Sequence, residues 1–248
     1  MAVRQAKWPL ELVIVRHGES AGNVARDAAH AKGLQTIDIA QRDCDVPLSP
    51  LGERQATALG AWMAQNDMPI DVVVSSPYLR AEQTAKLAMD SAGWPGAVLV
   101  IDERLREKDL GLLDGLTMQG FAARYPEQFA MRKRLGKFYY RPPGGESWND
   151  VILRLRSFID VARERYAERR MLLVAHQVVV LCLRYLLEDL TEREILDIDA
   201  QGDVANCSLT RYVSRNGALA LDRYNFTAPM EEKGQPVTAE PETRVATN

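Results

Sequence analysis

The chain has 248 residues, of which 46% are hydrophobic and 26% are charged. This composition is typical of a folded globular protein and argues against a disordered chain or a fibre. Lysine and arginine total 31 against 34 acidic residues, so the formal net charge is -3. A non-specific nucleic-acid binder needs a broad basic surface, so we expect no nucleic-acid partner. An anionic ligand must instead be held by a few well-placed cations.

Cysteine and histidine are scarce in this chain. It has three of each: Cys44, Cys182, Cys207, His17, His30 and His176. There is no C-x-x-C pair, so the sequence indicates neither a disulfide framework nor a cysteine-based zinc site. A histidine zinc site would need nearly all of the histidines. We therefore expect no metal and no cofactor.

No segment approaches the ~20 apolar residues that a membrane-spanning helix needs. The apolar run near the N-terminus is interrupted by Glu11 and ends at Arg16, with no small-residue cleavage site after it. These features predict no membrane partner and a cytoplasmic location. The oligomeric state cannot be inferred from the sequence.

Short apolar segments alternate with helical ones along most of the chain. The segments that predict strands buried on both faces are 12–15, 71–74, 98–101 and 171–175. Helices are expected from Ser49-Pro50 to about Met63, from Pro77 to near Gly93, over 146–169, and from His176 to Leu187. The alternation predicts an α/β fold, a three-layer sandwich with a mainly parallel central sheet and helices on both faces.

The remaining segments complete this organisation. Residues 208–213 and 218–224 flank Asn216-Gly217, a strong hairpin signal, and predict an antiparallel edge. The segment 104–145 is rich in charged and aromatic residues and predicts a helical cap insertion. We expect one domain over 8–227, whereas 228–248 has no apolar period and predicts a flexible tail.

Chemically useful side chains follow each of the four predicted parallel strands. Arg16 and His17 follow the first, Arg80 the second, Glu107 the third and His176 the fourth. Because ligands of open α/β sheets bind beyond the carboxyl ends of the strands, we expect these side chains to meet. Guanidinium forks match phosphate oxygens, a neutral imidazole can attack phosphorus, and a carboxylic acid can protonate a leaving oxygen. This pattern predicts a phosphoryl-transfer site that uses no metal.

Five motifs occur in the order VRHGESAGN, SSPYLRAEQT, LREKDLGLLDG, PPGGES and LLVAHQ. In this order the chain resembles the histidine phosphatase superfamily, with its phosphoglycerate mutase-like fold. The resemblance implies that His17 is phosphorylated and that Arg16, Arg80 and His176 clamp the phosphoryl group. It gives Asn23 a supporting role, alongside Gly18, which would let the backbone approach the phosphate, and Ser20.

The superfamily's branches differ in the position of the proton donor. The acid-phosphatase branch continues its first motif as RHGxRxP and carries an aspartate after the second histidine. Here Glu19 and Ser20 follow the first motif and Gln177 follows His176. The resemblance is therefore to the cytosolic branch, which makes Glu107 the acid. From the residues alone, Glu103 and Asp109 are nearby alternatives.

A basic run lies in the expected cap: Arg132, Lys133, Arg134, Lys137 and Arg141. Such a run is either a solvated helix face or a surface for a second anionic group of the substrate. The surrounding sequence looks like a fructose-2,6-bisphosphatase-type domain, which implies that Arg132 and Lys137 contact a second phosphate and that Gln177 contacts substrate. Leu181, Met118 and Trp148 depart from that pattern, where an arginine and two tyrosines are expected. These departures disfavour the bisphosphate as substrate.

The expected function is therefore hydrolysis of a small phosphorylated metabolite, such as a sugar phosphate, through a phosphohistidine. Alternatives are mutase-type phosphotransfer, a phosphoprotein phosphatase and a phospho-ligand binding module. Other residues have plainer explanations: His30 is expected at the surface, Asn23 could cap a helix, and the cysteines pack as small hydrophobes. The segment 24–45 is longer than is usual in the family and is expected to contribute to the pocket wall.

Overall fold

The computed structural model describes residues 8–239. Its centre is a six-stranded sheet in the order β3-β2-β4-β1-β5-β6. The strands are β1 (Glu11–Arg16), β2 (Val72–Ser75), β3 (Val98–Ile101), β4 (Arg170–Ala175), β5 (Leu209–Arg215) and β6 (Ala218–Phe226). Strands β1 to β4 pair in parallel, and β5 and β6 pair antiparallel. The mainly parallel sheet with an antiparallel edge is thus confirmed.

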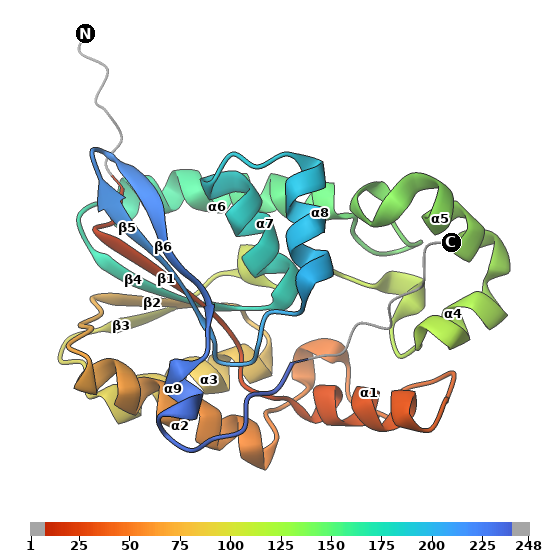
Figure 1. The fold of residues 1–248 in the computed structure, drawn as a ribbon, viewed down its shortest axis with the longest axis horizontal. Coiled ribbons are helices and arrows are strands. Elements are labelled where there is room, and N and C mark those ends of the chain that lie inside the picture. The colour runs from red at the N-terminus through yellow and green to blue at the C-terminus, as the bar shows by residue number, and fades with distance from the viewer. Residues whose placement is uncertain (1–7, 240–248) are drawn as a thin grey trace, which may run out of the picture.

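Helices cover both faces of the sheet (Figure 1). One face carries α2 (Pro50–Gln65), α3 (Leu79–Ala92) and α9 (Ala228–Glu231), and the other carries α6 (Trp148–Arg165), α7 (Gln177–Leu187) and α8 (Glu192–Gln201). Near the carboxyl ends of the parallel strands lie α1 (Ala21–Ala31), α4 (Met118–Arg124), α5 (Pro126–Tyr139) and the short turns η1 (Asp43–Asp45), η2 (Glu103–Leu105) and η3 (Gly111–Leu113). The sequence did not lead us to expect α8.

Alternation along the strands builds a separate core on each face. In β1, Leu12 and Ile14 join the core beneath α6 and α7, whereas Val13 and Val15 join the core beneath α2 and α3. A strand that contributes to both cores must be apolar at successive interior positions, as Leu12 to Val15 of β1 are. This packing confirms the three-layer architecture. The expectation that β3 is buried on both faces was wrong, because it is the edge strand and Val98 is 58% exposed.

The loop after β1 is held by close packing against α2. Ser49 caps α2 by accepting a hydrogen bond from the Gly52 N–H at 3.0 Å. A Cβ on Gly52 would lie 1.9 Å from the Glu19 carbonyl oxygen, and a Cβ on Gly18 would lie 2.6 Å from the Gly52 oxygen. Gly18 therefore allows backbone to meet backbone behind the pocket, and it does not line the pocket. The expected approach of the Gly18 backbone to a phosphate stays a prediction.

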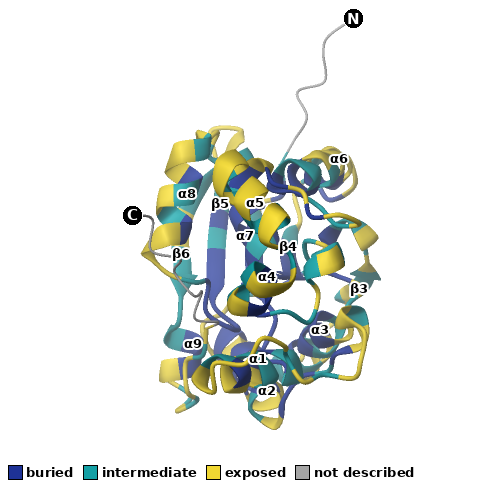
Figure 2. Cartoon of the chain, turned by 90° about the vertical axis from the view of Figure 1, so that its right-hand side faces the viewer, coloured by how far each residue is buried: buried dark blue, intermediate teal, exposed yellow. Residues whose placement is uncertain are grey.

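The cap lies over the strand ends and is joined to the segment that follows α1. The Thr117 N–H donates to the Gln35 carbonyl at 3.1 Å, and the Ile37 N–H donates to the Gly115 carbonyl at 2.9 Å. Figure 2 shows α4 and α5 in front of the buried strands, with α1 below them. The segment after α1 and the cap thus close two sides of the region beyond the sheet.

Residues 228–239 do not form the flexible tail that the sequence predicted. The Met230 side chain of α9 is fully buried against the α2 and α3 face. The Gln55 side-chain amide donates to the Pro236 carbonyl and to Thr238 Oγ1, both at 2.9 Å. One buried methionine and several hydrogen bonds hold this segment in place. Such contacts produce no periodic apolar pattern, so the sequence did not predict them. The rest of the predicted tail, 240–248, lies outside the described residues.

Replacement of Gly52 should destabilise the protein. Gly52→Ala places a methyl group against the Glu19 carbonyl, and we expect a loss of about 1–3 kcal/mol in the free energy of unfolding. Gly22→Ala is the matched control, because its Cβ would meet its nearest atom at 3.4 Å. That change within α1 should be neutral or stabilising. Urea unfolding measures both, and an equal effect of the two changes would contradict the packing argument.

Candidate active site

The carboxyl ends of β1 to β4 open into a pocket of about 290 Å³ beneath the cap. Its wall contains six cationic side chains and three carboxylates: Arg16, Arg26, Arg80, Lys108, Arg132, Lys137, Asp43, Glu107 and Asp114. The local excess of positive charge contrasts with the net charge of -3 for the whole chain. The anion-binding capacity expected from a few placed cations is therefore concentrated here.

His17 follows β1 directly and is 3% exposed. Its Nδ1 donates to the Gly18 carbonyl at 2.7 Å, which leaves the lone pair on Nε2. Arg80 Nε donates to that Nε2 at 3.3 Å. Burial holds the pKa of His17 well below its ordinary value, and the positive charges of Arg80 and Arg16 lower it further. The residue is therefore a neutral imidazole whose nucleophilic nitrogen faces the cationic end of the pocket.

The two arginines beside His17 are held by different partners. Arg16 is 1% exposed, and its Nη1 donates to the Val204 carbonyl at 2.6 Å. Arg80 lies in the first turn of α3, and its Nη1 donates to the Asp43 carbonyl at 2.5 Å. The Asp43 carboxylate also pairs with both terminal nitrogens of Arg80, at 3.1 and 3.2 Å. This carboxylate occupies the guanidinium edge to which a phosphate would bind.

His176 follows β4 and is fully buried beside His17. The two imidazole rings meet edge-on with centroids 5.1 Å apart. Its Nε2 lies 2.8 Å from Ser76 Oγ, and Nδ1 has no hydrogen-bond partner among residues 8–239. Burial holds the pKa of His176 well below its ordinary value, and Arg80 and His17 add to that shift. The predicted pair of histidines is thus assembled, although His176 does not itself line the pocket.

Glu107 reaches the pocket from the segment after β3. Its Oε1 accepts the Lys108 N–H at 2.7 Å, and Oε2 accepts the Val178 N–H of α7 at 3.4 Å. Burial raises the pKa of Glu107, although the Lys108 N–H, Arg80 and Arg154 oppose the shift. The carboxyl group therefore keeps its proton to a higher pH than an exposed glutamate does.

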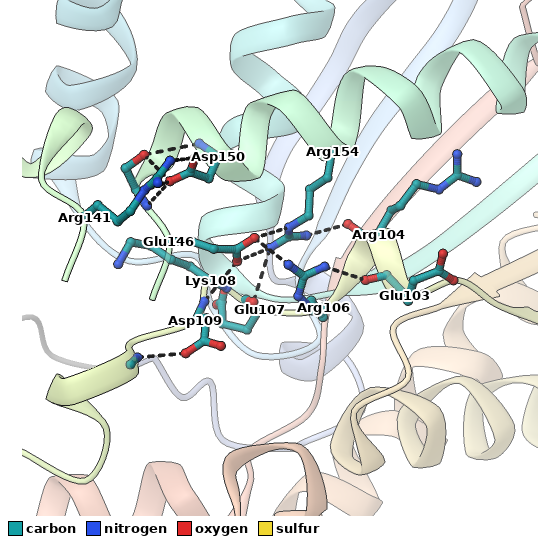
Figure 3. Close-up of polar contacts among 12 residues, drawn as sticks. Glu103, Arg104, Arg106, Glu107, Lys108, Asp109, Arg141, Glu146, Asp150 and Arg154 are labelled. Carbon is teal, nitrogen blue, oxygen red and sulfur yellow. Dashed lines mark hydrogen bonds and ion pairs between the residues drawn. The ribbon is translucent and has the colours of Figure 1, made fainter. Parts of the chain in front are cut away.

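A second set of charges fixes the backbone around Glu107 (Figure 3). Arg154 of α6 donates from Nη2 to the Glu107 carbonyl at 3.2 Å and from Nε to Glu146 Oε1 at 3.0 Å. Glu146 belongs to the PPGGES motif and also accepts from Arg106 Nη2 at 2.6 Å and from the Asp109 N–H at 3.1 Å. Glu146 of this motif therefore orients the segment that carries Glu107 without touching the Glu107 carboxyl group.

Three of the predicted binding residues line the pocket at the starts of helices. Ser20 and Asn23 form the capping box of α1, in which Ser20 Oγ donates to Asn23 Oδ1 at 3.0 Å. Gln177 begins α7, and its Nε2 donates to Asp203 Oδ1 at 2.7 Å. The Gln177 Oε1 atom is buried and has no hydrogen-bond partner within the described chain. Helix capping and a position in the pocket wall are therefore compatible for Asn23.

The basic run divides between the pocket and the solvent. Arg132 and Lys137 line the pocket, and Lys137 Nζ also pairs with Asp199 at 2.7 Å. Lys133 lies over the Phe129 ring, outside the pocket lining. At the positions that depart from the bisphosphatase pattern, Met118 and Trp148 line the pocket, whereas Leu181 is buried in the core beneath α7.

Comparison with known proteins agrees with this geometry. Residues 12–227 match the model of the histidine phosphatase superfamily, branch 1. The chain belongs to this family. A 2,3-bisphosphoglycerate-dependent phosphoglycerate mutase of Sinorhizobium fredii is 29% identical over 191 residues, covering 76% of this chain and 84% of the relative. A probable phosphoglycerate mutase of Yersinia enterocolitica is 31% identical, covering 82% of this chain and 84% of its own.

Solved structures extend the comparison to phosphatases. A mycobacterial glucosyl-3-phosphoglycerate phosphatase in complex with VO3 is 30% identical, with a TM-score of 0.67, and covers 87% of this chain and 98% of its own. A putative alpha-ribazole-5'-P phosphatase of Escherichia coli shares the fold, with a TM-score of 0.70 and 19% identity, over 88% of this chain and 96% of its own. The chain is thus an enzyme of the histidine phosphatase type. Likeness to a fructose-2,6-bisphosphatase-type domain stays a prediction.

Three pocket residues of this histidine phosphatase were missed or misplaced in the sequence analysis. Lys108 lies within the LREKDLG motif, directly after Glu107, and this adjacency could have predicted its place in the pocket wall. Asp43 reaches Arg80 from a loop, and no residue pattern distinguishes it from Asp45. His30 was expected at the surface but lines the pocket, as do Arg26 and Asp43. The expectation that 24–45 contributes to the pocket wall is therefore confirmed.

The described part of the chain offers neither a metal-binding cluster nor a membrane-spanning helix. Within residues 8–239, no cluster of three or more His, Cys, Asp or Glu side chains has an arrangement that could hold a metal ion. No helix in that part of the chain combines the length and apolar character needed to cross a bilayer.

Removal of the Asp43 charge should strengthen phosphate binding. The Asp43 carboxylate competes with an incoming phosphate for Arg80, whereas the Asp43 carbonyl would still hold Nη1 in Asp43→Asn. We expect the Ki of inorganic phosphate to fall by about 3- to 10-fold, since one competing charge-assisted contact is lost. Asp45→Asn is the matched control, because Asp45 pairs with Arg42 at the surface. Weaker phosphate inhibition in Asp43→Asn would instead show that the carboxylate positions Arg80 for phosphate.

Proposed function

We propose that this chain hydrolyses the phosphate monoester of a small metabolite through a phosphohistidine on His17. The observation that carries the proposal is the state of His17. Its Nδ1 proton is committed to the Gly18 carbonyl, its pKa is lowered, and its Nε2 lies 3.3 Å from Arg80 Nε. A neutral imidazole held in one tautomer beside two arginines is preorganised to attack phosphorus.

The first step transfers the phosphoryl group to the enzyme. His17 Nε2 forms a bond to phosphorus while the bond from phosphorus to the ester oxygen breaks. Glu107 enters protonated and gives its proton to the departing oxygen, which leaves as an alcohol. Arg16 and Arg80 stabilise the negative charge on the three equatorial oxygens, and His176 packs edge-on against the His17 ring.

The second step releases phosphate. Glu107, now a carboxylate, takes a proton from water, whose oxygen attacks phosphorus as the bond to His17 Nε2 breaks. The products are inorganic phosphate and neutral His17. The same carboxyl group serves as acid and then as base because it returns to its starting state after each cycle.

Several observations support a small phosphorylated substrate, with a sugar phosphate among the candidates. The pocket volume of about 290 Å³ suits a metabolite. Two of the similar proteins, a phosphoglycerate mutase and a glucosyl-3-phosphoglycerate phosphatase, are named for phosphoglycerate compounds. Buried Leu181 leaves one cation fewer for a second phosphate than the bisphosphatase pattern requires, so fructose 2,6-bisphosphate is not the favoured substrate.

The second candidate function is mutase-type phosphotransfer, which the phosphoglycerate mutase relatives favour. A mutase returns the phosphoryl group from histidine to another hydroxyl, whereas a phosphatase passes it to water. Incubation with 3-phosphoglycerate separates the two by its product. Our proposal predicts inorganic phosphate, and accumulation of 2-phosphoglycerate without phosphate release would favour the mutase.

The phosphohistidine can be tested with two variants that fail at different steps. With p-nitrophenyl phosphate, His17→Ala should lose at least about 10³-fold in kcat and form no acid-labile phosphoenzyme, because the nucleophile is absent. Glu107→Gln should still be phosphorylated, since p-nitrophenolate leaves without a proton. Its phosphoenzyme should then accumulate because the base for water is lost. Rapid quench with labelled substrate measures both, and retained labelling of His17→Ala would refute the mechanism.

The two shifted pKa values predict the shape of the pH profile with an alkyl phosphate. Activity should be lost at low pH only below the ordinary imidazole pKa of about 6.5, because the pKa of His17 is lowered and its neutral form reacts. Activity should fall as pH rises through the raised pKa of Glu107, because the proton donor is lost. In Glu107→Gln, kcat/KM should drop about 10²- to 10⁴-fold and this alkaline limb should vanish. An unchanged alkaline limb in that variant would contradict the assignment of Glu107.

A further inference from the structure

Lys108 is a pocket residue that the proposed mechanism does not use. It immediately follows Glu107 in the chain, and both side chains line the pocket. Figure 3 shows the Lys108 side chain leaving the same segment as Glu107 and running away from Arg154 and Arg106. A group that lines the wall next to the proton donor meets whatever is attached to the ester oxygen. Lys108 therefore faces the leaving-group part of the pocket.

The Lys108 ammonium group is a half-buried charge without a partner. Within the described chain, no hydrogen bond or ion pair joins its Nζ to another residue. A buried charge is normally paired, because desolvation of an unpaired ion is unfavourable. At the rim of a pocket, the missing partner is expected to be a ligand.

A second cation on the facing cap adds to this field. Arg132 of α5 also lines the pocket and, like Lys108, makes no ion pair with any described residue. Lys137 lines the same part of the wall but is committed to Asp199 at 2.7 Å. Two free cations from separate elements thus converge on the part of the pocket beyond Glu107, whereas Arg80 at the other end already has Asp43.

We infer that Lys108 is a specificity-determining residue that selects substrates whose leaving group carries an acidic function, a carboxylate or a second phosphate, close to the ester oxygen. This inference rests on the proposed hydrolysis and adds the class of leaving group to it. The Lys108 ammonium would pair with that acidic function while Glu107 protonates the adjacent ester oxygen. Arg132 would add a second contact from the cap.

The proposal gives the enzyme a preference that changes with pH. Burial lowers the pKa of Lys108 to about 8, and the charges of Arg132 and Lys137 lower it while those of Glu107 and Glu146 raise it. Lys108 is charged below that pH and neutral above it. The preference for acidic substrates should therefore weaken as pH rises from 7 to 9. A guanidinium group keeps its charge throughout this range, so this loss is a signature of Lys108.

The test compares substrates that differ in one charge. 3-Phosphoglycerate and glycerol 3-phosphate share the ester and the carbon chain, and a carboxylate in the first replaces a hydroxymethyl group in the second. The bisphosphate and monophosphate of propane-1,3-diol form the matched pair for a second phosphate. For each compound we would measure kcat/KM and its competitive Ki against p-nitrophenyl phosphate hydrolysis, from pH 6.5 to 9.5. The ratio within a pair cancels the titration of Glu107 and His17.

Three variants make the result decisive. Lys108→Met should reduce the acid preference of at least one pair by about 10- to 100-fold, the range for a charge-assisted hydrogen bond. Lys108→Arg should keep the preference and abolish its decline above pH 8. Lys133→Met removes a cation that lies over Phe129 outside the pocket lining and should leave the ratio unchanged.

The outcomes distinguish this inference from the proposed function. A preference that survives Lys108→Met, or that is absent in the unmodified protein, overturns the inference while hydrolysis stands. If the unmodified protein releases no phosphate and forms no phosphoenzyme, the proposed function is overturned, and this inference with it. The pair that responds identifies whether the acidic function is a carboxylate or a phosphate.

Discussion

The burial of positive charge at the end of β1 and after β2 governs the arrangement of this molecule. Arg16 is almost fully buried, and Arg80 reaches the same edge of the sheet, where the Asp43 carboxylate pairs with it. Unpaired charge in such a place is unfavourable, so each arginine is held by carbonyl oxygens and, for Arg80, by Asp43. His17 and His176 at the same edge add no buried charge, because their lowered pKa values keep them neutral. A pocket in which cationic side chains outnumber carboxylates favours an anionic ligand.

The same constraint explains why the proposed proton donor, Glu107, comes from a different part of the chain. A carboxylate next to Arg16 and Arg80 would be ionised by them and would lose its value as a proton donor. Glu107 instead lies after the edge strand β3, where burial outweighs the attraction of Arg80 and raises its pKa. The Glu146–Arg154 pair fixes this segment through its backbone, and among residues 8–239 the Glu107 carboxyl makes no direct salt bridge. Environments that move the pKa values of His17 and Glu107 in opposite directions are the pattern expected of paired catalytic groups.

The predictability of the site follows from the geometry of the sheet. Parallel strands that are buried on both faces are apolar throughout, so their ends are visible in the sequence, and the side chains after them must share an edge. His17, Arg80 and His176 were found in this way. Asp43 was not, because its contact with Arg80 depends on how a loop between α1 and α2 folds back. The docking of Met230 was missed for a similar reason: one buried methionine and a few hydrogen bonds produce no periodic pattern. The apolar sequence of β3 resembles that of a central strand, and only the strand order shows that β3 lies at the edge of the sheet.

The pocket therefore has two ends of different origin. The phosphoryl end is built on strand termini and on the backbone contact of Gly18 with Gly52. Neither glycine tolerates an added methyl group, because its Cβ would clash with backbone atoms. The leaving-group end is built from the segment around Lys108, the cap helix α5 and the loop after α1, which meet through side chains and a few backbone hydrogen bonds. An added methyl group at Gly18 or Gly52 would disturb the fold, whereas replacement of Lys108 or Arg132 would change the charge and shape that a substrate meets. Relatives with one fold and differently named substrates are the expected consequence. Under the proposed function, substrate preference in this chain would be determined by the cap and its neighbours, while the residues at the strand ends would carry out the chemistry.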